Sequence, residues 1–177
     1  MSMLLIELDS LLSGSFRSSG IIKPAELDFD PSFNFKFSGP ITLDVRVNTT
    51  DQLTYYVSCQ LSYKASGECR RCLKKVEQGR DCKIRGVFAF PEAIEKIVTK
   101  REGEDIFPLK NGAAAINLTD LVREYMVLDY PIYILCSEDC MGLCPSCGID
   151  LNIGSCQCRQ DSIDHRWAKL IELNKKK

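Results

Sequence analysis

The chain has 177 residues, of which 45% are hydrophobic and 27% are charged, and its formal net charge is −1. This composition is typical of a soluble globular protein with one sizeable core and a small appendage. No apolar run reaches the roughly 20 residues of a membrane-spanning helix, and residues 1–10 lack the basic flank of a secretory signal. We therefore expect a cytoplasmic protein, and its net charge argues neither for nor against nucleic-acid binding.

The first forty residues carry few regular elements in this interpretation. Apolar residues 3–8 predict a short strand at a sheet edge. Residues 13–15 and 18–20 are rich in Ser and Gly and predict turns or loops. Residues 33–37 then alternate between Phe and polar side chains, and Gly39-Pro40 ends that stretch.

Strict alternation of apolar and polar residues predicts strands between residues 41 and 90. Residues 41–48 and 54–64 each place one apolar face against a core. A turn is expected at Ser66-Gly67, and a further strand carries Cys82 and Ile84 on its apolar face. Consecutive strands joined by short turns indicate an antiparallel β-meander, curved enough to form a small open barrel.

One or two helices are expected after these strands, so the predicted fold class is α+β. Residues 92–99 allow a short helix within a loop region of mixed charge. The apolar residues of 118–129 fall on one helical stripe, which Asn117 or Thr119 can cap. Residues 163–174 predict a last helix with Trp167, Leu170 and Ile171 facing inward.

Ten cysteines give the strongest chemical signal. Cys59 and Cys82 share faces with apolar strand residues and are predicted to be small core side chains. The other eight are candidate metal ligands: Cys69, Cys72, Cys136, Cys140, Cys144, Cys147, Cys156 and Cys158. Cys144-Pro-Ser-Cys147-Gly148 is typical of a zinc knuckle, in which two thiolates approach one metal from a tight turn. We expect one or two structural Zn²⁺ ions, since four thiolates leave no coordination position for a reaction.

Two ways of sharing the thiols remain open. The first forms two groups of four, namely Cys144, Cys147, Cys156 and Cys158, and Cys69, Cys72, Cys136 and Cys140. The second holds a single zinc with Cys140, Cys144, Cys147 and either Cys156 or Cys158. In both, residues 136–177 form a zinc-ribbon-like cysteine module with a terminal helix, after an antiparallel β domain of residues 1–135. A disulfide cluster is less expected, because no secretory signal is present.

Positive charge is concentrated in one segment. Residues 64–85 carry eight basic and three acidic side chains, a net charge of +5, in a chain that is otherwise acidic or neutral. Such a stripe is a weak indication of phosphate binding, and a solvated strand face explains it equally well. The candidate residues for RNA or partner binding are Arg70, Arg71, Lys74, Lys75, Arg80, Lys83 and Arg85.

Two spaced motifs agree in order with those of a known family. One is Cys69-Arg-Arg-Cys72-Leu73, followed by a basic strand. The other is Cys140-Met-Gly-Leu-Cys144-Pro-Ser-Cys147-Gly-Ile-Asp-Leu151-Asn152, followed by Cys156-Gln-Cys158 and Asp164-His-Arg166-Trp167. Over about residues 40–174 the chain resembles the YceD family, the large ribosomal RNA subunit accumulation proteins. Two small departures are Asp150, where the family commonly has Asn, and His165, where it often has Pro.

The resemblance implies a non-enzymatic factor for accumulation or processing of large-subunit ribosomal RNA and for ribosome assembly. Its implied partners are large-subunit precursor RNA, a large-subunit ribosomal protein or both, with no membrane and no small-molecule substrate. The alternative is a zinc-ribbon transcription or DNA-binding protein, but residues 136–158 carry three acidic and no basic side chains. An enzyme is not expected, because His165 is the only histidine and no nucleophile motif is present.

Overall fold

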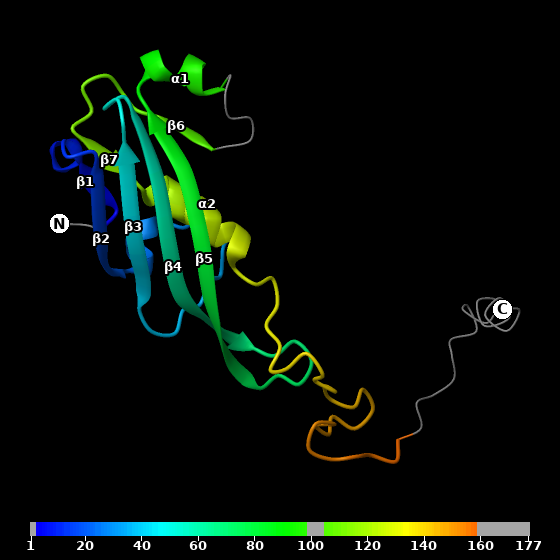
Figure 1. The fold of residues 1–177 in the computed structure, drawn as a ribbon. Coiled ribbons are helices and arrows are strands. Elements are labelled where there is room, and N and C mark those ends of the chain that lie inside the picture. Colours follow the sequence, from blue (N-terminus) through cyan, green and yellow to red (C-terminus); the bar gives the residue numbers. More distant parts are fainter. Residues whose placement is uncertain (1–2, 99–104, 159–177) are drawn as a thin grey trace, which may run out of the picture.

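A five-stranded sheet organises the residues that this computed structural model describes, 3–98 and 105–158 (Figure 1). Its strands lie in the order β2 (Ser15–Ile22), β3 (Ile41–Thr49), β4 (Thr54–Glu68), β5 (Lys75–Ala89) and β6 (Ile106–Pro108). The first four form an antiparallel meander, and β6 pairs in parallel with β5. The sheet does not close into a barrel, so the expected α+β fold is confirmed in its meander form.

Shorter elements flank this sheet. Strands β1 (Leu5–Glu7) and β7 (Ala115–Asn117) form a separate antiparallel pair. Two 3₁₀ turns, Leu8–Leu11 and Pro24–Leu27, bury Leu11 and Leu27 in the main core. Helix α1 (Pro91–Val98) follows β5, and helix α2 (Thr119–Asp129) follows β7.

The main core lies between one sheet face and α2, which Figure 1 shows behind β4 and β5. Residues of β3 alternate between buried and exposed, and Leu43, Val45 and Val47 lie fully inside. Gly86 on β5 allows α2 to approach closely, because a Cβ there would lie 2.9 Å from Leu121 Cδ1. The alternation seen in the sequence therefore decides which sheet face the helix covers.

The opposite sheet face is largely exposed. Helix α1 covers only one end of it, where Ala93 and Ile97 pack against Val87 and Ala89. Away from α1, the exposed positions of β2, β3, β4 and β5 carry mostly polar and charged side chains, with Ile21 on β2 as an exposed apolar exception. An antiparallel sheet with one solvated face commonly shows this pattern.

Two expected loops are strands in the structure. The turn expected at residues 13–15 is confirmed at residues 13 and 14. Residues 18–20, also expected to form a turn or loop, lie instead in β2, which pairs with β3 from Ser15 opposite Asn48 to Ile22 opposite Ile41. Strand pairing overrides the low strand propensity of Ser and Gly here. The turn expected at Ser66-Gly67 is also wrong, because β4 stays paired with β5 as far as Glu68 opposite Lys75.

The aromatic run at 33–37 forms no regular strand, and only Phe37 makes a bridge, to Ala65. Its rings instead cluster with Phe29 and Tyr130, whose ring centroid lies 4.3 Å from that of Phe35. Both helices within the described ranges occur where expected, and neither is long and apolar enough to cross a membrane. The helix expected over 163–174 lies outside the described residues.

Candidate metal centres

The eight candidate ligands form two groups. The far end of the long β4–β5 hairpin lies beside the segment that follows α2 (Figure 1). The hairpin turns through residues 69–74, and Ile134 forms a parallel bridge with Cys69. The Arg70 amide donates a hydrogen bond to the Ile134 carbonyl at 2.9 Å. This contact brings the thiols of the segment after α2 to the hairpin end.

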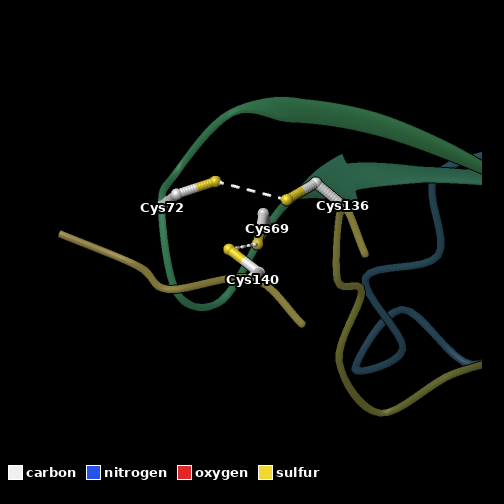
Figure 2. Close-up of side chains that lie close together, drawn as sticks. All are labelled: Cys69, Cys72, Cys136 and Cys140. Carbon is white, nitrogen blue, oxygen red and sulfur yellow. Dashed lines mark hydrogen bonds between the residues drawn. The ribbon is translucent and has the colours of Figure 1, made fainter. Parts of the chain in front are cut away.

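The hairpin cluster consists of Cys69, Cys72, Cys136 and Cys140, whose thiols point toward one another (Figure 2). The Sγ atoms of Cys69 and Cys140 are 3.8 Å apart, and those of Cys72 and Cys136 are 3.6 Å apart. Four thiolates at about 2.3 Å from one zinc ion have their sulfurs about 3.8 Å apart, so these spacings fit a tetrahedral site. They are much longer than the bond of about 2.05 Å in a disulfide.

The C-terminal cluster consists of Cys144, Cys147, Cys156 and Cys158, with all four sulfurs within 4.8 Å of one another. Cys144 is buried, Cys156 is half-buried and the other two thiols are exposed. The two clusters group the eight thiols as in the first of the two alternatives. Cys59 and Cys82 lie outside both clusters. The prediction of a core position is confirmed for Cys59, whereas Cys82 is half-buried and packs against the edge of the main core. Burial raises the pKa of Cys59 to about 12, as expected for a core thiol.

The two Cys-x-x-Cys turns share one backbone geometry. Two backbone hydrogen bonds close each turn. In the first, the Leu73 amide donates to the Cys69 carbonyl (2.9 Å) and the Cys69 amide donates to the Lys74 carbonyl (2.7 Å). In the second, the Gly148 amide donates to the Cys144 carbonyl (2.9 Å) and the Cys144 amide donates to the Ile149 carbonyl (2.9 Å). The residue after the second cysteine is left-handed in both, with φ +61° at Leu73 and +74° at Gly148. The chain therefore builds the same cysteine knuckle twice, although the sequence between the cysteines differs.

Backbone amides favour the thiolate form of the first cysteine in each knuckle. Burial opposes ionisation of Cys69, but the amide of Cys72 and neighbouring amides outweigh it and lower its pKa to about 6. The pKa of Cys144 is also lowered to about 6, chiefly by the amides of Cys147 and Ser146. Each cluster thus holds one thiol that ionises readily at neutral pH.

Neighbouring sulfurs resist further ionisation. Hydrogen bonds with the Cys140 and Cys72 thiols raise the pKa of Cys136 to about 12. The pKa of Cys158 is likewise raised to about 12, chiefly by Cys147. Four thiolates within 4.8 Å of one another would repel, and a bound divalent cation would offset part of their combined charge.

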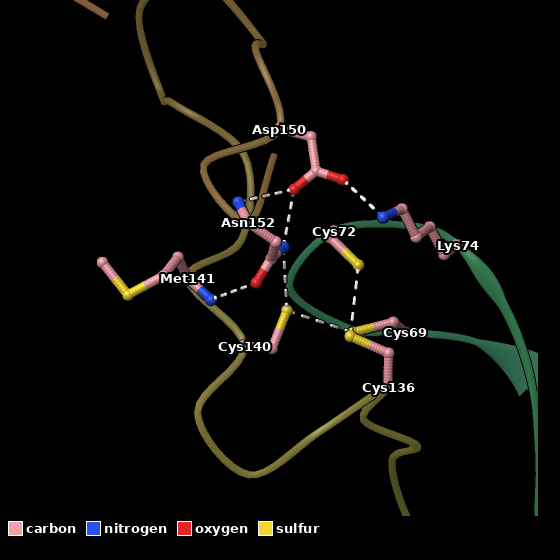
Figure 3. A network of polar contacts seen from close by, with 8 residues as sticks. All are labelled: Cys69, Cys72, Lys74, Cys136, Cys140, Met141, Asp150 and Asn152. Carbon is pink, nitrogen blue, oxygen red and sulfur yellow. Dashed lines mark hydrogen bonds and ion pairs between the residues drawn. The ribbon is translucent and has the colours of Figure 1, made fainter. Parts of the chain in front are cut away.

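A polar network joins the hairpin cluster to the C-terminal segment (Figure 3). The Asn152 Nδ2 atom donates to Cys140 Sγ at 3.5 Å and to Asp150 Oδ1 at 2.6 Å, while Asn152 Oδ1 accepts from the Met141 amide at 2.8 Å. Asp150 Oδ2 forms an ion pair with Lys74 Nζ at 2.9 Å. Sequence reasoning assigned Asp150 and Asn152 no role, and only their place in the second motif could have indicated one.

Two of the candidate basic residues lie against the thiol segment. Arg71 Nη1 donates to the carbonyl oxygens of Glu138 and Cys140 at 3.0 and 2.9 Å. The Arg70 guanidinium lies over the ring of Tyr133, 5.7 Å from its centroid. These contacts, like that of Lys74 with Asp150, hold the knuckle against the segment after α2.

The remaining candidates lie on β5. Arg80 forms an ion pair with Asp129 at the end of α2, at 2.7 Å. Lys75, Lys83 and Arg85 are exposed, and their side chains make no hydrogen bond or ion pair within residues 3–98 and 105–158. The structure therefore separates the seven candidates into four with internal contacts and three that face solvent.

The chain has an open β-sheet whose longest hairpin ends in a cysteine knuckle, and a second knuckle follows after α2. It is therefore a protein with two four-cysteine clusters of the kind that can hold structural metal ions. A family profile described as "Large ribosomal RNA subunit accumulation protein YceD" matches residues 57–174. The chain belongs to the YceD family, as its two motifs indicated.

Mycobacterial proteins are among the relatives. A protein of Mycobacterium tuberculosis (strain H37Rv) and one of Mycobacterium bovis, both described as uncharacterized, are each 30% identical over 133 residues, which is 75% of this chain. One of Mycobacterium leprae is 28% identical over 138 residues, or 78% of the chain. In each case the match spans 61% of the relative's own length. No solved structure matches the chain significantly.

Proposed function

We propose that this chain is a non-enzymatic cytoplasmic factor in the accumulation or processing of large-subunit ribosomal RNA and in ribosome assembly. It binds large-subunit precursor RNA, a large-subunit ribosomal protein or both. Membership of the YceD family is the observation that carries this proposal. The thiols also support it, because two groups of four are suited to holding structure and leave no reactive position.

The proposed cofactors are two structural Zn²⁺ ions. Their ligands would be Cys69, Cys72, Cys136 and Cys140 in one site, and Cys144, Cys147, Cys156 and Cys158 in the other. The sulfur spacing in the hairpin cluster and the amides facing Cys69 and Cys144 support this assignment. Metal binding in small cysteine modules contributes about 10–16 kcal/mol near neutral pH, enough to order residues 136–158.

We also propose that the chain divides near residue 135. Residues 1–135 would form the β domain, and residues 136–177 the cysteine module. The hairpin cluster crosses this division, since two of its thiols come from each side. Metal at that cluster would therefore fix the module to the hairpin.

A groove between the loop after β2 and the exposed side of α2 supports a protein partner. It encloses about 690 Å³ and is lined by Asp28, Phe29, Asp30, Pro31, Phe33, Arg123, Glu124, Val127 and Leu128. Its single cation, Arg123, is already paired with Asp120, so the acidic side chains dominate the rim. A basic segment of a ribosomal protein, carrying an apolar anchor, would complement this groove.

Crosslinking in cells, followed by sequencing of the bound RNA, tests the proposal. We expect large-subunit precursors to be enriched over small-subunit RNA, and large-subunit ribosomal proteins to copurify. Proteins that remain bound after ribonuclease treatment would be direct partners. Enrichment of neither class would overturn the proposal, and enrichment of DNA would favour the transcription-factor alternative.

The groove is tested in the same experiment by Leu128→Asp. Leu128 is 82% exposed, so this change should leave the fold intact but abolish ribosomal-protein binding that survives ribonuclease. Ile132→Asp is the matched control, because Ile132 is 95% exposed and lies outside the groove. Equal retention by both variants would exclude the groove as the protein-binding surface.

A further inference from the structure

Four adjacent strands place their polar side chains in one row across the exposed sheet face. Arg17 on β2 lies opposite Arg46 on β3, Arg46 lies opposite Ser58 on β4, and Ser58 lies opposite Arg85 on β5. All four residues are exposed. We call this set the arginine row, and two of its members, Arg17 and Arg46, lie outside the basic segment of the sequence.

The arginine row lacks internal compensation. Like charges directly opposite one another on neighbouring strands destabilise a sheet, and Arg17 and Arg46 are such a pair. Among the residues that the structure describes, no side chain forms a hydrogen bond or ion pair with the guanidinium of Arg17, Arg46 or Arg85. Three arginines in this state are suited to an anion that comes from outside the chain.

The surroundings of the row are polar and slightly hollowed. A depression of about 290 Å³ is lined by Arg17, Asp44, Arg46, Ser58, Cys59, Gln60, Lys83 and Arg85. These side chains supply four cations against one carboxylate, Asp44. Ser58 and Gln60 add hydrogen-bonding groups between the arginines.

We propose that the arginine row binds the phosphate backbone of RNA. Adjacent strands lie about 4.8 Å apart, so the row spans three spacings, on the order of 14 Å. That width exceeds one phosphate group and suits a backbone that crosses the strands. Arg guanidinium groups bind phosphates in bidentate fashion. This inference rests on the proposed function and names the surface through which the chain would hold precursor RNA.

The chemistry of the face favours RNA backbone over other anionic partners. No aromatic ring lies in the row, so the contacts would position the RNA without reading its bases. A membrane surface would require apolar side chains beside the cations, but the lining of the depression is polar apart from Cys59. Lys83 and Arg85 come from the basic segment of the sequence, whereas Arg71, Lys74 and Arg80 hold internal contacts.

The test uses the full-length, metal-loaded chain and its triple variant Arg17→Gln, Arg46→Gln and Arg85→Gln. Binding to a single-stranded large-subunit RNA transcript is measured over a series of salt concentrations. Each phosphate contact on a single strand contributes a slope of about 0.7 in log K against log salt, so the variant should lose about 2 units of slope. We also expect its affinity at low salt to fall at least ~10-fold.

The control replaces three exposed lysines elsewhere, Lys23→Gln, Lys36→Gln and Lys110→Gln, and removes the same charge. It should keep the wild-type slope. Circular dichroism and metal content verify the fold of each variant. If the triple variant fails to fold, Arg85→Gln alone is tested in its place. This single variant should lose about 0.7 units of slope.

The outcomes separate the two proposals. If the wild-type chain binds RNA and the triple variant binds with unchanged slope and affinity, the arginine row is not the RNA surface and the proposed function stands. If the wild-type chain binds no large-subunit RNA at all, both the RNA part of the proposed function and this inference fail.

Discussion

Leu73 occupies a backbone position that suits glycine. It follows the hairpin knuckle with φ +61°, as Gly148 follows the other knuckle with φ +74°. A left-handed conformation costs a residue with a Cβ roughly 1–2 kcal/mol, whereas glycine adopts it freely. The Leu73 side chain is 59% exposed and contributes little packing in return.

We therefore expect Leu73→Gly to stabilise the metal-loaded protein. The gain in the free energy of unfolding should be about 0.5–1 kcal/mol, after allowing for the greater freedom of glycine in the unfolded chain. Urea unfolding with metal present measures it. The reverse change, Gly148→Leu, should lower the free energy of unfolding by a similar or larger amount. A loss of stability in Leu73→Gly would contradict the equivalence of the two knuckles.

Asn152 supports the hairpin cluster from the C-terminal segment. Its Nδ2 atom faces the sulfur of Cys140, and its Oδ1 atom fixes the amide of Met141. Groups that hydrogen-bond to metal ligands typically change metal affinity 10- to 100-fold when removed. Asn152→Ala should therefore weaken binding of one of two metal equivalents by about that factor.

Competition with a chromogenic chelator measures this change. Asn111→Ala is the control, since Asn111 is exposed and remote in sequence from both clusters. Unchanged affinities at both sites would show that the Asn152–Cys140 contact has no influence on the metal.

At the scale of elements, three side chains anchor the end of α2 to the long hairpin. The Asp129 carboxylate accepts hydrogen bonds from Tyr63 Oη at 2.8 Å and from Arg80 Nη2 at 2.7 Å. Burial works against the charge of Asp129, but the hydrogen bonds from Arg80 and Tyr63 outweigh it and lower its pKa below 3.8. The folded protein therefore stabilises the ionised form of the Asp129 carboxylate relative to the protonated form.

This shift predicts a specific dependence on pH. Because the folded pKa lies below the unfolded one, the contribution of Asp129 to stability is complete above about pH 5 and is lost as the pH falls through 4 and below. Asp129→Asn should lower the free energy of unfolding on the order of 1 kcal/mol at pH 7 and less at pH 3. Unfolding of both proteins across this range checks the prediction, with metal content measured at each pH. A difference that is constant with pH would exclude an ionic role for Asp129.

The sequence predicts those strands that bury one face against the core, because burial of one face produces alternating apolar and polar residues. Alternation identified β3 and most of β4 and β5, because one face of each lies against the core. Strand β2 was not predicted from the sequence, because its Ser- and Gly-rich residues form a strand only through pairing with β3. The thiol groups could be anticipated from spacing, whereas the arginine row could not, because it exists only when the register of four strands is known.

At the scale of the molecule, the sheet core and the cysteine clusters are separate sources of stability. The main core lies between the sheet and α2, and neither cluster contributes a thiol to it. Removing metal should therefore loosen residues 136–158 while the central strands keep their structure. Amide hydrogen exchange before and after chelation measures this difference, and global unfolding on chelation would contradict it.

Metal content also distinguishes the two clusters. The intact chain should bind two equivalents of zinc, and Cys144→Ser with Cys147→Ser should bind one. Cys59→Ala is the control and should keep both equivalents, because its thiol lies in the core. Elemental analysis gives the stoichiometry, and a single equivalent in the intact chain would overturn the two-site assignment.

The hairpin cluster has a consequence for the order of events during synthesis. Its two pairs of thiols are separated by 63 residues, those between Cys72 and Cys136. A ribosome that has just incorporated Cys72 has not yet translated β6, β7 or α2. The fourth sulfur becomes available only with Cys140, after every strand and helix described here has been translated. Complete metal capture at this cluster can therefore occur only on a chain whose β domain has been fully made, and a chain arrested earlier leaves Cys69 and Cys72 without their partners.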